Sequence, residues 1–265
     1  MKPAEPASSG ARRRFLRAAL ASLAGAALAG CDRLSENEAF TGLLRRAQYL
    51  SRGAQRLVTG RDAMAQEFTE ADITQAFRSN GTDMPDSKLY RQLAQDGFAR
   101  WTLAVGGLVQ KPMRFSLAQL RAMPARTQIT RHDCVEGWSA IAKWTGVPLQ
   151  RVLAEVQPLP LAKYVVFRCA DPMDGSDQTA PGSTYYESID LDEASHPQTI
   201  LAYEVNGKPL PVMNGAPLRL RVERQLGYKH AKYLMRIDLV ERLDNIRGGK
   251  GGYWEDLGYE WYAGI

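Results

Sequence analysis

The sequence predicts an α+β protein with mixed, mostly antiparallel sheets and a few helices. Short apolar stretches such as residues 164–167 are typical of strands, and residues 218–222 alternate apolar with basic side chains as a strand does. The Asn206-Gly207 pair between residues 200–203 and 210–212 indicates a β-hairpin. No repeat or heptad pattern is present, which excludes solenoids and coiled coils.

Further elements follow from local signals. Strands are expected at residues 101–105, 128–130 and 233–240, and a loop of turn-forming residues at 174–183. Ser116 caps a short helix that ends at Met123, and Pro148 suits the first turn of another helix. We expect the Gly-rich and aromatic residues 248–265 to fold back over the domain.

The net charge of the chain comes mostly from its first thirty residues. The chain of 265 residues has 34 basic and 29 acidic side chains and a formal charge of +5. Residues 1–30 hold five of the basic side chains and one of the acidic ones, so 29 and 28 remain. The remainder is nearly neutral, and we expect no nucleic-acid partner.

Residues 1–30 resemble an export signal. A basic segment that ends with residues 12–17 (RRRFLR) precedes the uncharged residues 18–30, which are too few to span a bilayer. The arginines resemble a twin-arginine signal, which exports proteins folded around a cofactor. Leu28-Ala29-Gly30-Cys31 resembles a lipobox, and Asp32 resembles an inner-membrane retention signal. A lipidated Cys31 would anchor a periplasmic protein, and the alternative is a plain cleaved signal with an incidental cysteine.

Residues 31–74 are expected to form an N-terminal helical arm or spacer before a domain of residues 75–265. Residues 35–58 place apolar side chains at helical spacing, with a capping box of Ser35 and Glu38 and a stop at Gly60. A helix packed on the domain is an equal alternative.

Residues 130–139 (TRHDCVEGWS) concentrate reactive side chains in one short stretch. A thiol, an imidazole, two carboxylates, a guanidinium and an indole occur within ten residues, which is unusual for a core strand. We expect Cys134 on a loop between a strand and a helix, where scaffolds present chemistry. His132 and Arg131 would lower the pKa of this thiol, whereas Asp133 and Glu136 would raise it.

Three roles remain open for the cysteines. If Cys31 is lipidated, Cys134 and Cys169 are left, and a disulfide is the default for a pair in an oxidising compartment. A Cys134 thiolate that binds a metal is the second role, and a thiol hydrolase of Cys134 and His132 is the third. The three histidines and the cysteines lack the spacing of a zinc site.

A basic set near the C-terminus suggests an anion site. It comprises Arg219, Lys229, His230 and Lys232, and its alternative is a solvated strand face. Gly215 and Gly227 permit a close backbone approach, and a Pro-containing turn brings Asn214 near Arg219. Such a site suits a phosphate, which arginine binds with two hydrogen bonds.

Together these segments resemble the molybdopterin-binding domain of the sulfite oxidase family over residues 75–262. The resemblance rests on five motifs in order, which are CVEGW at 134–138, WTGVPL at 144–149, NGKPLP at 206–211, NGAPLR at 214–219 and GYKHAK at 227–232. It implies that Cys134 is the single protein ligand to molybdenum, beside the dithiolene sulfurs of one pterin. His132, Asp133 and Trp138 are expected to surround that ligand.

The resemblance also assigns cofactor-binding residues. These are Asn214, Arg219 and the segment His230, Ala231 and Lys232 for the pterin and its phosphate, Cys169 at the end of its strand, and Arg78, Ser79 and Asn80 as a first contact segment. A cofactor role for Cys169 argues against a disulfide with Cys134.

The family implies a molybdenum- and molybdopterin-dependent oxidoreductase of the periplasmic bacterial branch. We expect two-electron oxygen-atom transfer on a sulfoxide or related small oxide. No cytochrome b5-like or dimerisation domain is found, so we expect a monomer with a separate redox partner, a cytochrome or membrane haem protein. One alternative is a sulfite dehydrogenase that donates to a cytochrome, although its sulfite-binding arginine cluster has no clear match. Another is a non-catalytic lipoprotein that binds an anion or a partner.

Overall fold

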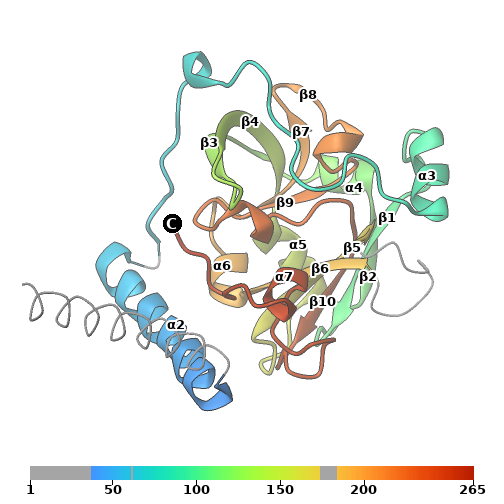
Figure 1. Cartoon of the computed structure of the whole chain (residues 1–265). Helices are drawn as coiled ribbons and strands as arrows, with labels where there is room; N and C mark the ends of the chain where they lie inside the picture. The colour runs from blue at the N-terminus through green and yellow to red at the C-terminus, as the bar shows by residue number, and fades with distance from the viewer. Residues whose placement is uncertain (1–36, 61, 174–183) are drawn as a thin grey trace, which may run out of the picture. The chain divides into compact units, whose positions relative to one another are not determined.

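The computed structural model describes residues 37–60, 62–173 and 184–265. Its contacts divide the chain into residues 1–54 and residues 55–265. The second unit contains two five-stranded sheets and a few short helices, which confirms the predicted α+β class (Figure 1). The predicted export signal, the lipidation site Cys31, the cap Ser35 and the loop 174–183 lie outside the described residues.

The first sheet has the strand order β2-β1-β10-β5-β6. Within it β1 and β10 run parallel, and every other pair is antiparallel, as predicted. Its strands are β1 (Thr102–Gly107), β2 (Met113–Ser116), β5 (Tyr164–Pro172), β6 (Thr184–Asp190) and β10 (Leu234–Val240).

The second sheet is antiparallel throughout, with the order β3-β4-β7-β8 and with β9 also paired to β7. The predicted hairpin is confirmed, because Asn206 and Gly207 both have positive φ between β7 and β8. The prediction of a strand at residues 210–212 is wrong. β8 ends at Pro209, and Val212 begins a 3₁₀ turn. The strands are β3 (Arg126–Asp133), β4 (Ser139–Pro148), β7 (Ile200–Val205), β8 (Lys208–Pro209) and β9 (Arg219–Arg221).

The helices are short, apart from α2 (Glu38–Thr59). In α2, Asn37 Oδ1 accepts hydrogen bonds from the backbone N–H groups of Ala39 and Phe40, and the helix ends before Gly60, as predicted. No helix among the described residues is both long and apolar enough to cross a membrane. The others are α3 (Lys88–Gln95), α4 (Leu117–Ala122), α5 (Leu149–Val156), α6 (Leu191–Ala194), α7 (Tyr253–Asp256), and the 3₁₀ turns η1 (Glu70–Asp72), η2 (Val212–Asn214) and η3 (Gly227–Lys229).

The main core fills the space around the first sheet and α5. Leu149, Val152, Leu153 and Val156 form the apolar face of α5, as the sequence predicts, and all four are buried. They join buried side chains from β1, β5, β9 and β10 in one cluster. This core fixes the strand ends from which the reactive side chains project.

The position of Cys134 differs from the prediction. Cys134 follows β3, but the chain turns back into β4, and α5 begins only at Leu149. Residues 130–133 of the reactive stretch therefore end β3, and Cys134 lies in the loop of a β-hairpin rather than in a strand-to-helix loop. β4 pairs with β3 on one side and β7 on the other, and its alternating burial shows that one face of the strand is packed on the core.

Residues that precede the predicted domain boundary pair with β3 and β4. The backbone of Phe68 donates to Ile129 at 2.8 Å, and that of Thr74 donates to Ile141 at 3.0 Å. This segment, blue-green in Figure 1, crosses the edge of the second sheet on its way to α3. At the other end, residues 263–265 pair with residues 224–226, so the C-terminus folds back over the domain as predicted.

Candidate active site

The β3–β4 hairpin loop holds Cys134 by backbone hydrogen bonds. Its N–H donates to the Trp138 carbonyl at 2.9 Å, and its own carbonyl accepts from Gly137 at 3.0 Å. Gly137 has a φ of +84°, which a side chain would strain. The Trp138 indole donates to the Glu136 carboxylate at 2.9 Å. The loop therefore presents the thiol in a fixed position.

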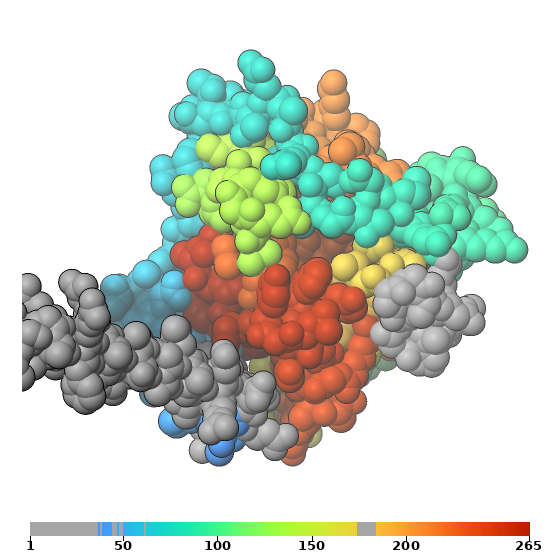
Figure 2. All heavy atoms as spheres, viewed as in Figure 1, coloured from blue at the N-terminus to red at the C-terminus, as the bar shows by residue number. Residues whose placement is uncertain are grey.

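Cys134 lines a cavity of about 740 Å³, its open mouth included. Figure 2 shows the C-terminal residues, in red, at the surface beside the yellow-green residues of the hairpin. One wall is aromatic, with Trp254 stacked on Tyr259 at a centroid distance of 5.3 Å. The lining residues are Asn80, Gly81, Thr82, Cys134, Val135, Glu136, Asp171, Met173, Tyr185, Gly227, Tyr228, His230, Lys232, Trp254 and Tyr259.

Several groups act on the Cys134 thiol. Burial raises its pKa most, and the Glu136 carboxylate raises it further. The backbone N–H of Glu136 and the Arg78 guanidinium lower the pKa. Arg131 instead forms an ion pair with Asp133 at 2.9 Å. Cys134 and Cys169 are both free, so the disulfide alternative is wrong.

The charged face of β9 is buried rather than solvated. Arg219 and Arg221 are both fully buried, and their guanidinium carbons lie 5.0 and 4.4 Å from the Trp144 ring centroid. Burial, with Arg221 nearby, lowers the pKa of Arg219 to about 9. Glu223 forms an ion pair with Arg221. The alternative of a solvated strand face is therefore wrong.

Lys232 adds a further cation beneath the cavity. Its Nζ donates to the carbonyls of Asn80, Thr82 and Met213 at 2.6, 2.6 and 3.0 Å, so all three ammonium protons have partners. Burial and the Arg219 charge nevertheless lower its pKa to about 7. A bound anion would relieve this repulsion among buried cations.

Buried polar atoms without a partner gather in the same region. They include Asn80 Oδ1, Asn214 Nδ2, Arg219 Nε and His230 Nδ1. An unpartnered buried polar group is costly, so these atoms indicate a ligand with both hydrogen-bond donors and acceptors. With the neighbouring cations, they fit an anionic polar ligand.

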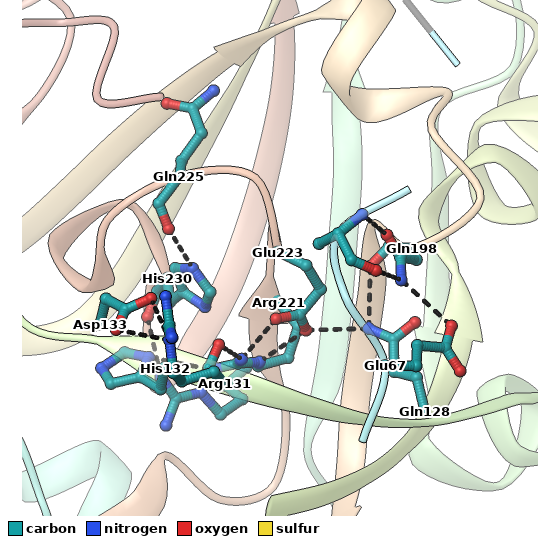
Figure 3. Close-up of polar contacts among 12 residues, drawn as sticks. Glu67, Gln128, Arg131, His132, Asp133, Gln198, Arg221, Glu223, Gln225 and His230 are labelled. Carbon is teal, nitrogen blue, oxygen red and sulfur yellow. Dashed lines mark hydrogen bonds and ion pairs between the residues drawn. The ribbon is translucent and has the colours of Figure 1, made fainter. Parts of the chain in front are cut away.

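A buried hydrogen-bond network runs behind the cavity wall (Figure 3). His132 Nδ1 lies 2.9 Å from Arg221 Nη1, and Arg221 binds both carboxylate oxygens of Glu223. Gln128 Nε2 donates to Glu223 at 2.8 Å. His230 Nε2 donates to the Gln225 carbonyl at 3.0 Å. Because His132 Nδ1 already accepts from Arg221, His132 is poorly placed to act as the base of a Cys134 hydrolase.

The structure brings together four of the predicted site residues. Cys134, Asn80, His230 and Lys232 line the cavity. Asn214 and Arg219 lie together, since Arg219 Nη1 donates to the Asn214 carbonyl at 3.0 Å, as predicted. Of the remaining predicted residues, Arg78 lies over the Trp138 ring, Ser79 donates to the Met213 carbonyl, and Ala231 is buried with its carbonyl bonded to Leu220.

Cys169 is not one of the described residues that line the cavity. Cys169 on β5 pairs with Leu234 on β10, and its thiol is buried. Whether it touches a bound cofactor stays a prediction.

Several further residues in and behind the cavity wall were not predicted from the sequence. Arg221 shares the face of Arg219 because it follows two positions later on a strand, so alternation alone could have identified it. Trp254 and Tyr259 lie in the C-terminal stretch that the sequence predicts to fold back. No local sequence pattern marked Thr82 or Asp171 as a site residue, since only the fold brings their segments together.

Residues 91–245 match the family described as oxidoreductase molybdopterin-binding domain. The chain belongs to this family. The molybdopterin-binding fold and the cofactor that the resemblance implied are thereby confirmed.

Proteins from several bacteria are similar to this chain. A putative protein-methionine-sulfoxide reductase subunit YedZ1 from Azospira oryzae is 35% identical over 96% of this chain and 88% of its own length. The protein-methionine-sulfoxide reductase catalytic subunits MsrP of Xanthomonas axonopodis pv. citri and Xanthomonas campestris pv. campestris are 41% and 40% identical. The chain spans about three fifths of each MsrP protein. The sulfane dehydrogenase SoxCD from Paracoccus pantotrophus superposes with a TM-score of 0.48, at 23% identity over 54% of this chain and 39% of that chain.

The residues present fit a molybdenum–pterin cofactor. Cys134 offers a soft sulfur ligand at the cavity surface. The unpartnered polar atoms suit the amide and amine groups of a pterin, and the buried cations suit its phosphate.

Proposed function

We propose that this oxidoreductase reduces a sulfoxide by two-electron oxygen-atom transfer. The observation that carries the proposal is the cavity, which joins the Cys134 thiol to buried cations and unpartnered polar atoms. When bound, molybdenum and its pterin supply the two-electron redox change. Cys134 would ligate the metal, while Arg219, His230 and Lys232 would hold and orient the pterin.

The cavity favours an uncharged sulfoxide with an apolar substituent over an inorganic anion. Val135, Met173, Trp254 and Tyr259 give its mouth an apolar and aromatic character. No arginine is among the described residues that line it, whereas sulfite is an anion that calls for one. Relatives named protein-methionine-sulfoxide reductases agree with this choice.

We further propose that electrons come from a separate redox partner, a cytochrome or a membrane haem protein. The relatives are named as subunits, which supports an assembly of more than one chain. We also infer that the protein is periplasmic, exported through the twin-arginine route and anchored to the inner membrane by a lipidated Cys31. The support is the resemblance of residues 12–17 to an export signal and of residues 28–31 to a lipobox.

The substrate is tested by two assays on molybdenum-loaded protein. Methionine sulfoxide with a reduced viologen measures reduction, and sulfite with ferricyanide measures oxidation. We expect sulfoxide turnover well above sulfite turnover. The reverse ratio would establish a sulfite dehydrogenase, and protein that binds no molybdenum in a cofactor-competent host would favour a non-catalytic lipoprotein.

The anchor is tested by fractionation of cells that express the full chain. Cys31→Ala should release the protein from the membrane fraction, whereas Cys134→Ala should leave it there. A Cys31→Ala protein that stays on the membrane would contradict the lipid anchor.

A further inference from the structure

Reduction of a sulfoxide requires protons inside the cavity. In the balanced step, one sulfoxide, two protons and two electrons give one sulfide and one water, with the electrons supplied by the redox partner. The following inference rests on the proposed function. A side chain at the cavity surface that releases a proton would act as a general acid.

Two basic lining residues are poorly suited to this task. His230 is neutral, because burial and Arg221 hold its pKa well below the usual range, and its one ring proton is donated from Nε2 to the Gln225 carbonyl. Its Nδ1, which has no partner, can therefore only accept. Lys232 donates all of its ammonium protons to backbone carbonyls.

The hydroxyl and carboxyl groups nearby are mostly committed as well. Tyr185 donates to the Tyr228 carbonyl at 2.5 Å, and Tyr228 donates to the Glu260 carbonyl at 2.6 Å. Burial raises the pKa of both phenols, so they hold their protons. Glu136 is exposed to solvent and accepts from the Trp138 indole.

Asp171 differs from all of these groups. It lies on β5, lines the same cavity as Cys134, and is only 5% exposed. Its Oδ1 has no hydrogen-bond partner, although it is buried. The Thr82 side chain hydrogen-bonds to the same carboxyl group. A buried carboxyl with one free oxygen at a cavity surface is suited to carry and release a proton.

The surroundings of Asp171 favour its protonated form. Burial raises the pKa of this carboxyl, while the Thr82 hydrogen bond and the Lys232 charge lower it, and the net direction is upward. The neighbouring titratable groups are Lys232 and Tyr233 from the segment that leads into β10, Tyr90 from α3, and Cys169 from the same strand.

We propose that Asp171 is the proton donor of this cavity. Its O–H bond breaks, and a new O–H bond forms on the oxygen that leaves the sulfoxide sulfur. The resulting carboxylate takes its next proton from water by way of the Thr82 hydroxyl, which also lines the cavity. Asp171 thereby supplies the two protons one at a time, in step with the two electrons.

The test is Asp171→Asn in the molybdenum-loaded protein. The amide keeps the size and polarity of the carboxyl but cannot release a proton. We expect full molybdenum and pterin content and a kcat for methionine sulfoxide that is about 100-fold lower. The wild-type rate should fall as pH rises and Asp171 loses its proton, and this fall should disappear in the variant. Asp238→Asn is the matched control, a buried aspartate on β10 paired with Arg168 and Arg236.

A second measurement needs no substrate. The infrared difference spectrum between resting wild-type protein and Asp171→Asn should contain the carbonyl band of one protonated carboxylic acid. This band should fade as pH rises, at a pH above the ordinary range of an aspartate, because burial raises the pKa of Asp171. Asp238→Asn should leave the band in place. An unchanged band or an unchanged pH profile in Asp171→Asn would overturn the assignment. So would loss of molybdenum, which would make Asp171 a cofactor-holding group, or loss of the pH dependence in Glu136→Gln instead. Wild-type protein that shows the band but reduces no sulfoxide would overturn the proposed function alone.

Discussion

Arg221 Nη1 lies 2.9 Å from His132 Nδ1 in a fully buried contact behind the cavity (Figure 3). Because a guanidinium only donates, His132 Nδ1 must accept, and the ring proton is on Nε2. Burial and the charges of Arg221, Arg219 and Lys232 lower the pKa of His132, and the Glu223 carboxylate forms an ion pair with Arg221.

Arg221→Met should destabilise the protein strongly. It leaves the Glu223 carboxylate buried without its cation, and such a loss costs about 3–5 kcal/mol. The free energy of unfolding from urea titrations measures the effect. Arg221→Met combined with Glu223→Gln should be less destabilised than Arg221→Met alone, since no unpaired charge remains. Equal losses in the two proteins would contradict this account.

Cys134→Ala should abolish turnover while the fold survives. The thiol lies in a hairpin loop whose position depends on backbone hydrogen bonds, so we expect a stability loss below about 2 kcal/mol. Metal analysis should show that molybdenum binding is weakened, because the protein ligand is gone. Circular dichroism checks the fold, and sulfoxide turnover that persists in this variant would remove Cys134 from the role of metal ligand.

Gly227→Ala should displace the His132 ring. A Cβ at this position would lie 2.6 Å from His132 Nε2 and 3.1 Å from the Asp133 carbonyl. We expect a loss of about 1–3 kcal/mol and lower molybdenum content, because the strand beside Cys134 must shift. Gly106→Ala is the control, since its Cβ would find its nearest neighbour at 3.5 Å. Similar losses in both variants would show that the effect is not specific to the cavity wall.

His196 should make the protein sensitive to mild acid. Burial and the Arg224 charge lower its pKa to about 4, so the folded state binds fewer protons than the unfolded state between about pH 4 and 6.5. Stability therefore falls as pH drops through that window, by at most about 1.4 kcal/mol per unit from this group. His196→Asn retains an acceptor for the Gln198 N–H but does not titrate, and its stability should change less. Urea midpoints across the window measure this, and parallel curves would refute it.

Local sequence determined the parts of this protein that depend on neighbours along the chain. The turn at Asn206 and Gly207, the apolar face of α5 and the stop of α2 at Gly60 follow from positive φ, helical spacing and caps within a few residues. The motif around Cys134 and the segment 227–232 indicated the family for the same reason, since each motif is contiguous.

Tertiary structure alone decided what surrounds the reactive thiol. The sequence predicted a strand-to-helix loop, but β4 pairs between β3 and β7 and turns the Cys134 segment into a hairpin. The alternative that β9 has a solvated charged face is wrong. Arg221 is buried because Glu223 pairs with its charge, and it contacts His132, 89 residues away in the chain. Asp171, Thr82 and Trp254 meet at one cavity only after β5, the segment before α3 and α7 have packed. Burial, which raises the pKa of Asp171, depends on contacts between distant segments, and a single segment of sequence does not encode it.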